Sequence, residues 1–174
     1  MDDEQRFTSL YEKHYGHVAR FVLRRAPDLD TGDVVASVFT TAWRRLPDVP
    51  ADEPLPWLYA VARHTLANEF RGRRRARQLD EQVRAAPAGH LPDPAEGVVD
   101  QLALATTLAG LHDRDQEILR LIAWEGLSVR EVATVLGCGR TAVAMRVYRL
   151  RRAFRHLLAA SDAPSPSLPV HSRK

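Results

Sequence analysis

Residues 128–154 read SVREVATVLGCGRTAVAMRVYRLRRAF, a stretch with six arginines and one acidic residue. A charge run of this kind is usually a solvated surface. The stretch nevertheless keeps the apolar spacing of a helix, because four residues recur at intervals of three and four: Val129, Val132, Ala133 and Leu136. Ser128 and Glu131 have the spacing of a capping box, so the pattern predicts a helix that begins directly after Ser128.

A second predicted helix follows after a very short connection. Gly137 can adopt the left-handed conformation that ends a helix, and Cys138 and Gly139 complete a turn of about three residues. From Arg140 onward, apolar residues again recur every three or four positions: Val143, Val147, Leu150, Phe154, Leu157 and Leu158. A helix, a tight turn and a longer basic helix make up a helix-turn-helix, whose second helix lies in the DNA major groove.

The charge of this second helix favours DNA as its partner. A helical hairpin that only needed a soluble surface would mix glutamate with arginine, whereas residues 140–156 contain no acidic residue. DNA phosphates are natural counterions for such a surface. Arg140 stands at the N-terminal end of the helix, where side chains reach base edges, while Arg146 and Arg149 are placed to meet phosphates.

Charge is segregated along the chain more than its formal net value of +3 suggests. One basic cluster is RGRRRAR at residues 71–77, and the other is the helix after Arg140. Residues 78–100 between them hold five acidic residues against Arg84 alone. The alternation predicts two nucleic-acid contacts separated by an acidic linker with a different neighbour.

The composition bounds the class of protein. The chain has 174 residues, of which 45% are hydrophobic, enough for one ordinary domain or two small ones. No apolar run approaches the roughly 18 to 20 residues that span a bilayer, so no membrane insertion is expected. The first residues, MDDEQRF, are acidic and lack the pattern of a signal peptide, which predicts a cytoplasmic location.

The sequence offers no pattern of catalytic or metal-binding residues. It contains no carboxylate pair, no Ser/His/Asp set and no phosphate-binding glycine loop, and its seven histidines are scattered. Cys138, the single cysteine, stands between two glycines and is interpreted as a small turn residue. We therefore predict a protein that is not an enzyme and uses no metal or cofactor.

The predicted fold is all-α, with two small helical domains joined by a flexible linker. Three helices are expected in residues 5–77: from Phe7 to before Pro27, from a cap near Thr31 to Pro47, and from Trp57 to about Arg71. The acidic linker is assigned to residues 78–100, because its proline and glycine content breaks helices. Residues 101–160 are predicted to hold helices around 101–111 and 113–124 and the helix-turn-helix, ahead of a disordered tail at 161–174.

The outward face of the third helix has the composition of a stacking surface. At one turn per 3.6 residues, five residues fall within a band of about 60°: Trp57, His64, Asn68, Arg71 and Arg75. An aromatic ring, hydrogen-bonding groups and arginines in a row suit single-stranded nucleic acid. Whether Trp57 stacks on bases or covers the core stays open at this point. The proline-rich loop at residues 46–56 is close enough to form the wall of a pocket for an extruded base.

Together, these segments resemble a bacterial RNA polymerase sigma factor of the extracytoplasmic-function (ECF) group. The resemblance rests on DVVASVFTTAWRRL at 33–46, PWLYAVARHTLANEFRGRRR at 56–75 and LHDRDQEILRLIAWEGLSVREVATVLGCGRTAVAMRVYRLRRAF at 111–154. It covers nearly the whole chain, and it lies in the order and spacing of both halves more than in any single motif.

The resemblance implies a protein that binds core RNA polymerase and directs promoter-specific transcription initiation. Residues 5–77 would bind the polymerase clamp through the second helix and would recognise and melt the minus-10 element with the third. Residues 101–160 would read the minus-35 element, and the acidic linker would thread toward the polymerase active-site channel. Promoter DNA and core polymerase are thus the expected partners, and the family suggests an anti-sigma protein as a third.

Three sets of contact residues follow from the family pattern. The minus-35 set is Arg140, Thr141, Ala144, Met145, Arg146, Arg149 and Arg152. The minus-10 set is Trp57, His64, Asn68, Arg71, Arg74 and Arg75. The core polymerase set is Asp33, Val34, Ser37, Val38, Thr41 and Arg44.

The chain departs from the family pattern at several of these positions. Ala36 and Ser37 stand where a glutamine and an acid are usual, and Ala142 and Ala144 stand where a threonine and a lysine are common. His64 and Asn68 replace a common asparagine and aspartate. The first pair concerns the contact with the polymerase clamp, which would lean on apolar residues or on other acids such as Asp33, and the others concern which bases are read. A second interpretation is a helix-turn-helix regulator whose N-terminal helices sense a ligand or dimerise, although the arginines that end the third helix argue against it.

Overall fold

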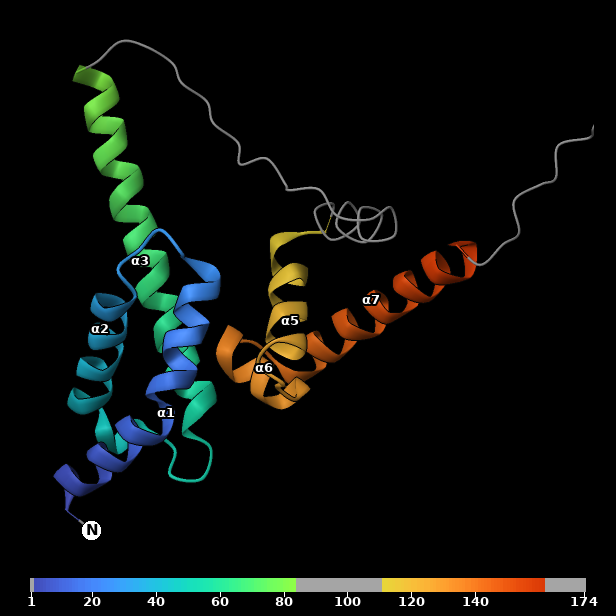
Figure 1. Cartoon of the computed structure of the whole chain (residues 1–174). Coiled ribbons are helices and arrows are strands. Elements are labelled where there is room, and N and C mark those ends of the chain that lie inside the picture. The colour runs from blue at the N-terminus through green and yellow to red at the C-terminus, as the bar shows by residue number, and fades with distance from the viewer. Residues whose placement is uncertain (1, 84–110, 162–174) are drawn as a thin grey trace, which may run out of the picture.

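The computed structural model describes residues 2–83 and 111–161, and every regular element within these two ranges is helical (Figure 1). This finding confirms the predicted all-α class. For residues 77, 79–83 and 156–161 only the backbone is described. The helix predicted around 101–111, most of the acidic linker and residues 162–174 of the tail lie outside the described residues.

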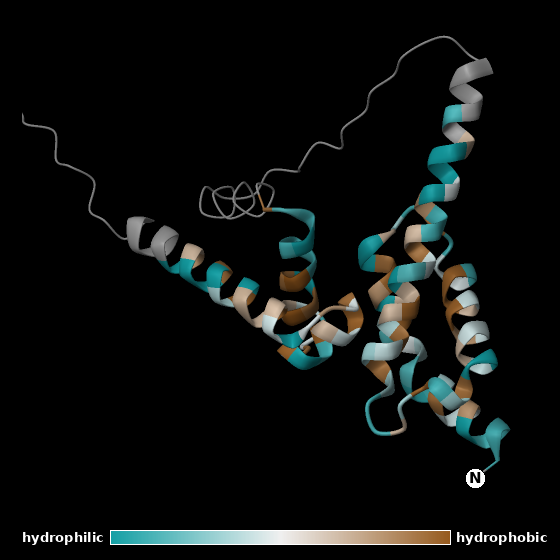
Figure 2. Ribbon diagram, turned by 180° about the vertical axis from the view of Figure 1, so that it is seen from behind, coloured by the Kyte–Doolittle hydropathy of each residue, from teal (hydrophilic) through white to brown (hydrophobic). Residues whose placement is uncertain are grey.

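Three helices form the N-terminal domain: α1 (Asp3–Arg25), α2 (Thr31–Arg44) and α3 (Pro54–Val83). Each packs against the other two, and a 3-10 turn, η1 (Leu46–Asp48), begins the connection from α2 to α3. Their apolar faces meet along the centre of the bundle (Figure 2). Phe21, Val38 and Leu58 from the three helices are fully buried there. Such burial contributes about 1.5–3 kcal/mol for each large side chain.

The predicted start of α2 is correct, but its cap is the preceding residue. Asp30 is extended and its carboxylate accepts a hydrogen bond from the backbone N–H of Asp33 at 3.1 Å. Thr31, the predicted cap, is already the first helical residue. An aspartate satisfies an orphan N–H of the first turn at least as well as a threonine does, so either residue fits the sequence pattern.

α3 is longer at both ends than the sequence analysis predicted. It begins at Pro54 rather than Trp57, because a proline in the first turn lacks only an N–H that would have no helical partner. It continues past Arg71 to Val83. The added residues are mostly arginine, alanine, glutamine, leucine and glutamate, which are strong helix formers. Residues 78–83, predicted as the start of the linker, are therefore helical.

The C-terminal domain contains α5 (Asp113–Ala123), α6 (Val129–Leu136) and α7 (Arg140–Ser161). The capping box is confirmed, because Ser128 accepts from the Glu131 backbone and Ser128 N–H donates to the Glu131 carboxylate at 2.7 Å. Hydrogen bonds from the side chain and backbone of Ser128 lower the pKa of Glu131. Gly137 has φ of 60° and ends α6 in the left-handed conformation. The helix-turn-helix predicted at residues 128–154 is thus present.

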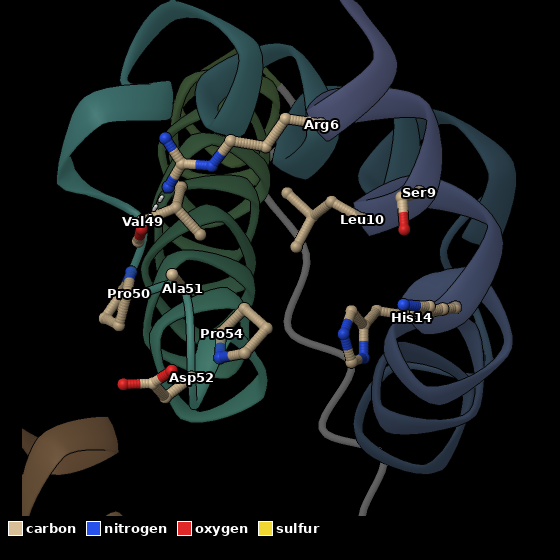
Figure 3. A pocket seen from close by; sticks show the side chains of 10 residues that line it. Arg6, Ser9, Leu10, His14, Val49, Pro50, Ala51, Asp52 and Pro54 are labelled. Carbon is tan, nitrogen blue, oxygen red and sulfur yellow. Dashed lines mark hydrogen bonds between the residues drawn. The ribbon is translucent and has the colours of Figure 1, made fainter. Parts of the chain in front are cut away.

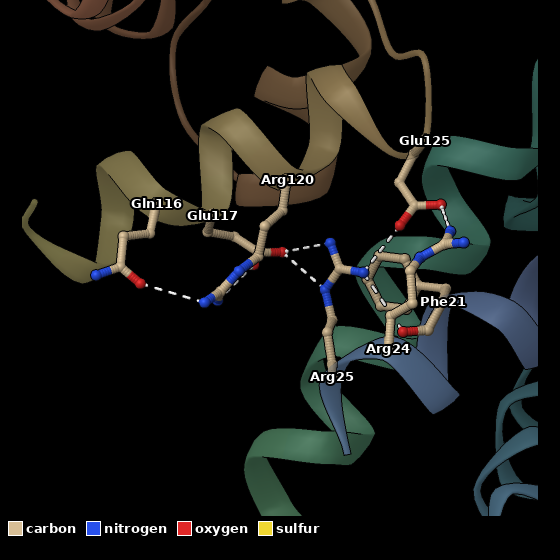
Figure 4. Close-up of polar contacts among 7 residues, drawn as sticks. All are labelled: Phe21, Arg24, Arg25, Gln116, Glu117, Arg120 and Glu125. Atoms are coloured by element: carbon tan, nitrogen blue, oxygen red, sulfur yellow. Dashed lines mark hydrogen bonds and ion pairs between the residues drawn. The ribbon is translucent and has the colours of Figure 1, made fainter. Parts of the chain in front are cut away.

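The two domains touch each other. α6 packs against α3, and the buried residues of both domains belong to one cluster. The sequence analysis predicted two domains joined by a flexible linker and did not predict this contact. Ion pairs join the domains as well, because Arg25 at the end of α1 pairs with Glu117 at 3.1 Å and with Glu125 at 2.9 Å (Figure 4).

Candidate nucleic-acid and polymerase interfaces

The first turns of α7 form an exposed surface that the helix core holds in place. Val143, Val147 and Leu150 are buried and fix one side of the helix against α5 and α6. Six of the seven predicted minus-35 residues are solvent-exposed: Arg140, Thr141, Ala144, Met145, Arg149 and Arg152. The acid-free sequence makes this surface positive, as a DNA-reading helix requires.

Arg146, the seventh residue of that set, is placed differently. It is half-buried, and its guanidinium donates to the Asp115 carboxylate at 2.8 Å, which ties α7 to the first turn of α5. It therefore lies away from the exposed face, and the expectation that it is free to meet a phosphate is corrected. The sequence showed only that Arg146 lies off the apolar stripe, and could not show that an acid from another helix faces it.

Tyr148 is a candidate contact residue that the sequence analysis missed. Its side chain is 56% exposed, and it lies four residues from both Ala144 and Arg152. Residues four apart share a helix face, so Tyr148 stands in the middle of the exposed surface. The same spacing rule, applied to the polar side of α7, would have found it.

The outward face of α3 presents the predicted minus-10 residues to solvent. His64, Asn68, Arg71, Arg74 and Arg75 are exposed. Arg71 donates a hydrogen bond to the Asn68 side chain, so these two groups already act as a pair. Arg74 lies about 100° from Arg75 and about 60° from Arg71 around the helix, beside the edge of the band.

Trp57 contacts the domain core, which is one of the two roles that the sequence left open. The ring is half-buried and packs against the domain core, while the Arg45 guanidinium lies 5.8 Å from its centre. Arg45 is itself held by an ion pair with Asp48 at 2.9 Å. One part of the indole thus supports the core, and a cation from the loop lies near its face.

The loop between α2 and α3 lines a cavity of about 350 Å³, and the cavity faces α1 (Figure 3). Arg6 holds the loop by donating to the Val49 carbonyl at 2.7 Å. The loop therefore does line a pocket, but α1, not the outward face of α3, supplies the other wall. His14 borders this cavity; its Nδ1 atom is buried without a hydrogen-bond partner, and burial, then His17 and Lys13, lower its pKa.

The exposed face of α2 holds four of the six predicted polymerase residues. Asp33, Ser37 and Arg44 are exposed, and the half-buried Thr41 donates to the Ser37 carbonyl at 3.0 Å. With Ala36 and Thr40 they line a shallow hollow. Val34 and Val38 are 4% and 0% exposed and face the domain core, so they are removed from the set of surface contacts. Their spacing already matched the apolar stripe of this helix.

A group of aromatic side chains flanks this α2 face and was also missed. Trp43 is 47% exposed and meets Phe7 edge-on at 5.1 Å, while Tyr11 and Tyr15 are about 40% exposed beside Phe39. Trp43 and Tyr11 follow the apolar spacing of their helices, which is typical of core residues. Spacing gives the side of a helix, but it does not show how much of a ring its neighbours cover.

The described ranges contain neither a candidate metal site nor a candidate membrane-spanning helix. Within residues 2–83 and 111–161, no group of three or more histidine, cysteine, aspartate or glutamate side chains could hold a metal ion. Among the helices described, none has the length and apolar character for a membrane crossing.

The chain is 32% identical over 147 residues to the RNA polymerase sigma factor CnrH of Cupriavidus metallidurans. The match covers 78% of this chain and 77% of the relative. This chain belongs to the RNA polymerase sigma factors.

Further comparisons place the sigma factor in the ECF group. Models of sigma-70 region 2 and sigma-70 region 4 match residues 10–76 and 101–154. The ECF sigma factor SigL of Mycobacterium tuberculosis is 29% identical over 84% of this chain and 85% of its own length. A solved structure of CnrH in complex with the cytosolic domain of CnrY superposes with a TM-score of 0.54 at 29% identity, covering 90% of this chain and 89% of that one.

These relationships decide between the two interpretations of the sequence. The N-terminal half matches sigma-70 region 2, so the alternative of a regulator with a sensing or dimerisation domain is set aside. The sigma factor directs transcription initiation by RNA polymerase at promoter DNA.

Proposed function

We propose that this sigma factor reads its promoter with two surfaces, the exposed face of α7 and the outward face of α3. Residues 101–160 bind the minus-35 element, and residues 5–77 bind core polymerase and the minus-10 element. The observation that carries the proposal is the acid-free face of α7, which buried Val143, Val147 and Leu150 hold outward as a rigid unit. A rigid, positive helix face is what major-groove reading needs.

The α7 surface divides into base-reading and phosphate-binding parts. Arg140 and Thr141 stand in the first turn, the part of a recognition helix that reaches deepest into the groove. Arg149 and Arg152 lie further along, where the helix leaves the groove and meets the backbone. Ala144 and Met145 offer methyl groups, which suit contact with a thymine methyl.

On α3, the proposed role is to hold unpaired bases of the minus-10 element. His64, Asn68 and Arg71 supply hydrogen-bonding groups on one exposed face, and Arg75 extends it toward the DNA backbone. Trp57, Arg45 and Asp48 lie at the end of this face nearest the loop. Arg74, beside the edge of the band, is assigned to the phosphate backbone.

Core polymerase is proposed to bind the exposed face of α2 through Asp33, Ser37, Thr41 and Arg44. Ala36 and Ser37 leave a shallow hollow there, which a protruding side chain of the polymerase can fill. The sigma factor is proposed to act in the cytoplasm without a chemical step of its own. Because CnrH has been solved in complex with the cytosolic domain of CnrY, control by an anti-sigma protein is proposed for this chain as well.

Run-off transcription with purified core polymerase tests the surfaces separately. Ser37→Arg fills the α2 hollow and should abolish co-purification with core enzyme, whereas Thr8→Arg, at an exposed position of α1, should not. Arg140→Ala should retain core binding and lose promoter selectivity. A chain that binds promoter DNA tightly and specifically alone, and for which Ser37→Arg leaves transcription unchanged, would overturn the assignment.

A further inference from the structure

The second half of α1 carries a positive surface that the promoter contacts proposed above do not use. Residues 13–25 contain four lysine or arginine residues, two histidines and no acidic residue. At 3.6 residues per turn, Lys13, His17 and Arg20 fall within a band of about 60° on one side of the helix. All three side chains are exposed. We call Lys13, His17 and Arg20 the α1 basic face.

The charges of this face are not neutralised by neighbouring acids. Arg24 and Arg25, in the same acid-free segment, pair with glutamates of the C-terminal domain. In the part of the chain that the structure describes, neither Lys13 nor Arg20 pairs with a carboxylate, and the Arg20 guanidinium instead lies 3.4 Å from Nδ1 of His17. Because like charges held side by side repel each other, an anionic partner would stabilise this arrangement.

The two sides of α1 suit different kinds of partner. The exposed aromatic rings of the helix, Tyr11 and Tyr15, lie beside Phe39 of α2 and far around the helix from the α1 basic face. Protein interfaces are rich in aromatic side chains and poor in lysine, so the aromatic side is the one that fits a protein. A lysine, a histidine and an arginine without an exposed ring between them fit the phosphates of a nucleic acid.

The α1 basic face adjoins the end of α3 where the proposed minus-10 surface begins. Lys13 borders the cavity between α1 and the α2–α3 loop, and Pro54, the first residue of α3, lines the same cavity (Figure 3). Trp57 follows three residues later. A DNA strand that passes Trp57 can therefore continue across the mouth of the cavity onto α1. Lys13 and Arg20 are about 10 Å apart along the helix axis, a span of about three phosphates at about 3.4 Å per phosphate along one strand.

We propose that the α1 basic face binds phosphates of the unpaired promoter strand where this strand leaves the minus-10 surface at the Trp57 end of α3. The inference rests on the proposed minus-10 role of α3 and adds a second helix to the DNA-binding surface of the N-terminal domain. Phosphates carry no sequence information, so this contact contributes affinity and position, while selectivity stays with α3 and α7.

The salt dependence of promoter affinity measures the contact. Holoenzyme made from core polymerase and the sigma factor is titrated with a promoter that supports run-off transcription, pre-melted by mismatches in the minus-10 region. Lys13→Gln with Arg20→Gln removes two contacts to single-stranded phosphates, so the slope of log affinity against log salt should become shallower by about 1.4 units. The advantage of wild type over this variant should then shrink about sevenfold between about 50 and about 200 mM salt.

Control variants separate this contact from a general effect of charge or folding. Arg114→Gln removes a positive charge from an exposed position of α5, and Glu12→Gln removes a negative charge from α1 outside the band. Both should keep the wild-type slope. Lys13 and Arg20 are exposed and glutamine is a good helix former, so the double variant should melt at the wild-type temperature and bind core enzyme with wild-type affinity.

Neutral methylphosphonate linkages, placed one at a time in the unpaired strand, locate the contact. Linkages just beyond the unpaired minus-10 bases should weaken binding of the wild-type holoenzyme and should not weaken the double variant further. Equal effects of every linkage on the two proteins, or a wild-type slope in the double variant, would overturn the proposal. Loss of core binding by the double variant without DNA would overturn it too, because the face would then bind polymerase.

The same measurements keep this inference distinct from the function on which it rests. His64→Ala with Asn68→Ala tests the minus-10 role of α3 on the same promoter. If that variant melts the promoter like wild type while Lys13 and Arg20 still couple to the linkages, the role of α3 is wrong and the phosphate contact on α1 stands. If it fails in melting while no linkage couples to Lys13 or Arg20, the role of α3 stands and the α1 contact is wrong.

Discussion

At the scale of single residues, Arg140 and Arg149 are both exposed on α7, but they lie half a turn apart around the helix and so reach different groups. Arg140→Ala should relax selectivity at one base pair of the minus-35 element by about 1–3 kcal/mol. Arg149→Ala should weaken all sequences about equally and reduce the salt slope by about one unit. Affinity measured for each base substitution at several salt concentrations distinguishes them, with Arg114→Ala on the exposed side of α5 as the charge control. Equal, sequence-independent losses for Arg140 and Arg149 would contradict the division.

Arg146 should behave as a structural residue, in contrast to its neighbours. Its pair with Asp115 is partly exposed, at 31% and 23% for the two side chains, so we expect Arg146→Ala to lower the free energy of unfolding by only about 1 kcal/mol. Asp115→Ala should cost a similar amount, and the double variant should cost less than the sum of the two. Chemical denaturation of these variants beside Arg149→Ala, which should unfold like wild type, provides the measurement. Additive losses would show that the two residues do not interact.

At the scale of elements, the turn between α6 and α7 depends on one glycine. Gly137 has φ of 60°, and a Cβ there would meet no atom within 4 Å, so Gly137→Ala should cost only the left-handed backbone strain, about 1–2 kcal/mol. Gly72, inside α3, also has open space around it but carries no positive φ, so Gly72→Ala is the control and should be neutral or slightly stabilising. Thermal unfolding decides between them, and similar melting temperatures for the two variants would refute the backbone explanation.

At the scale of the whole molecule, the α3 face should act in promoter melting within the holoenzyme. His64→Ala with Asn68→Ala should spare core binding and closed-complex formation but reduce permanganate-reactive thymines in the minus-10 region, because extrusion of a base costs a few kcal/mol that these contacts offset. Asn68→Ala also releases Arg71, so Arg71→Ala is measured alongside it. A template pre-melted by mismatches should restore most activity. Equal impairment on both templates, with core binding lost, would make the face structural.

Local rules were enough for the elements of this protein and for most of its candidate surfaces. The capping box at Ser128 and Glu131, the left-handed Gly137 and the outward side of α7 depend on residues within a turn or two of one another, and such spacing can be read directly from the sequence. The end of α3 was predicted too early, however, because residues 78–83, assigned to the acidic linker, are mostly helix-forming residues and continue the helix.

Only the tertiary structure decided how side chains from distant segments pair. Val34 and Val38 are core residues because α1 and α3 cover them, and Arg146 is paired because Asp115, 31 residues earlier in the chain, faces it. Arg25 and Glu125 are 100 residues apart, and no spacing rule relates them. The sequence by itself therefore determined the helices, their faces and the family. Which charges are free for DNA and which hold the two domains together depended on the packing of helices against one another, since burial and pairing are properties of neighbours in space.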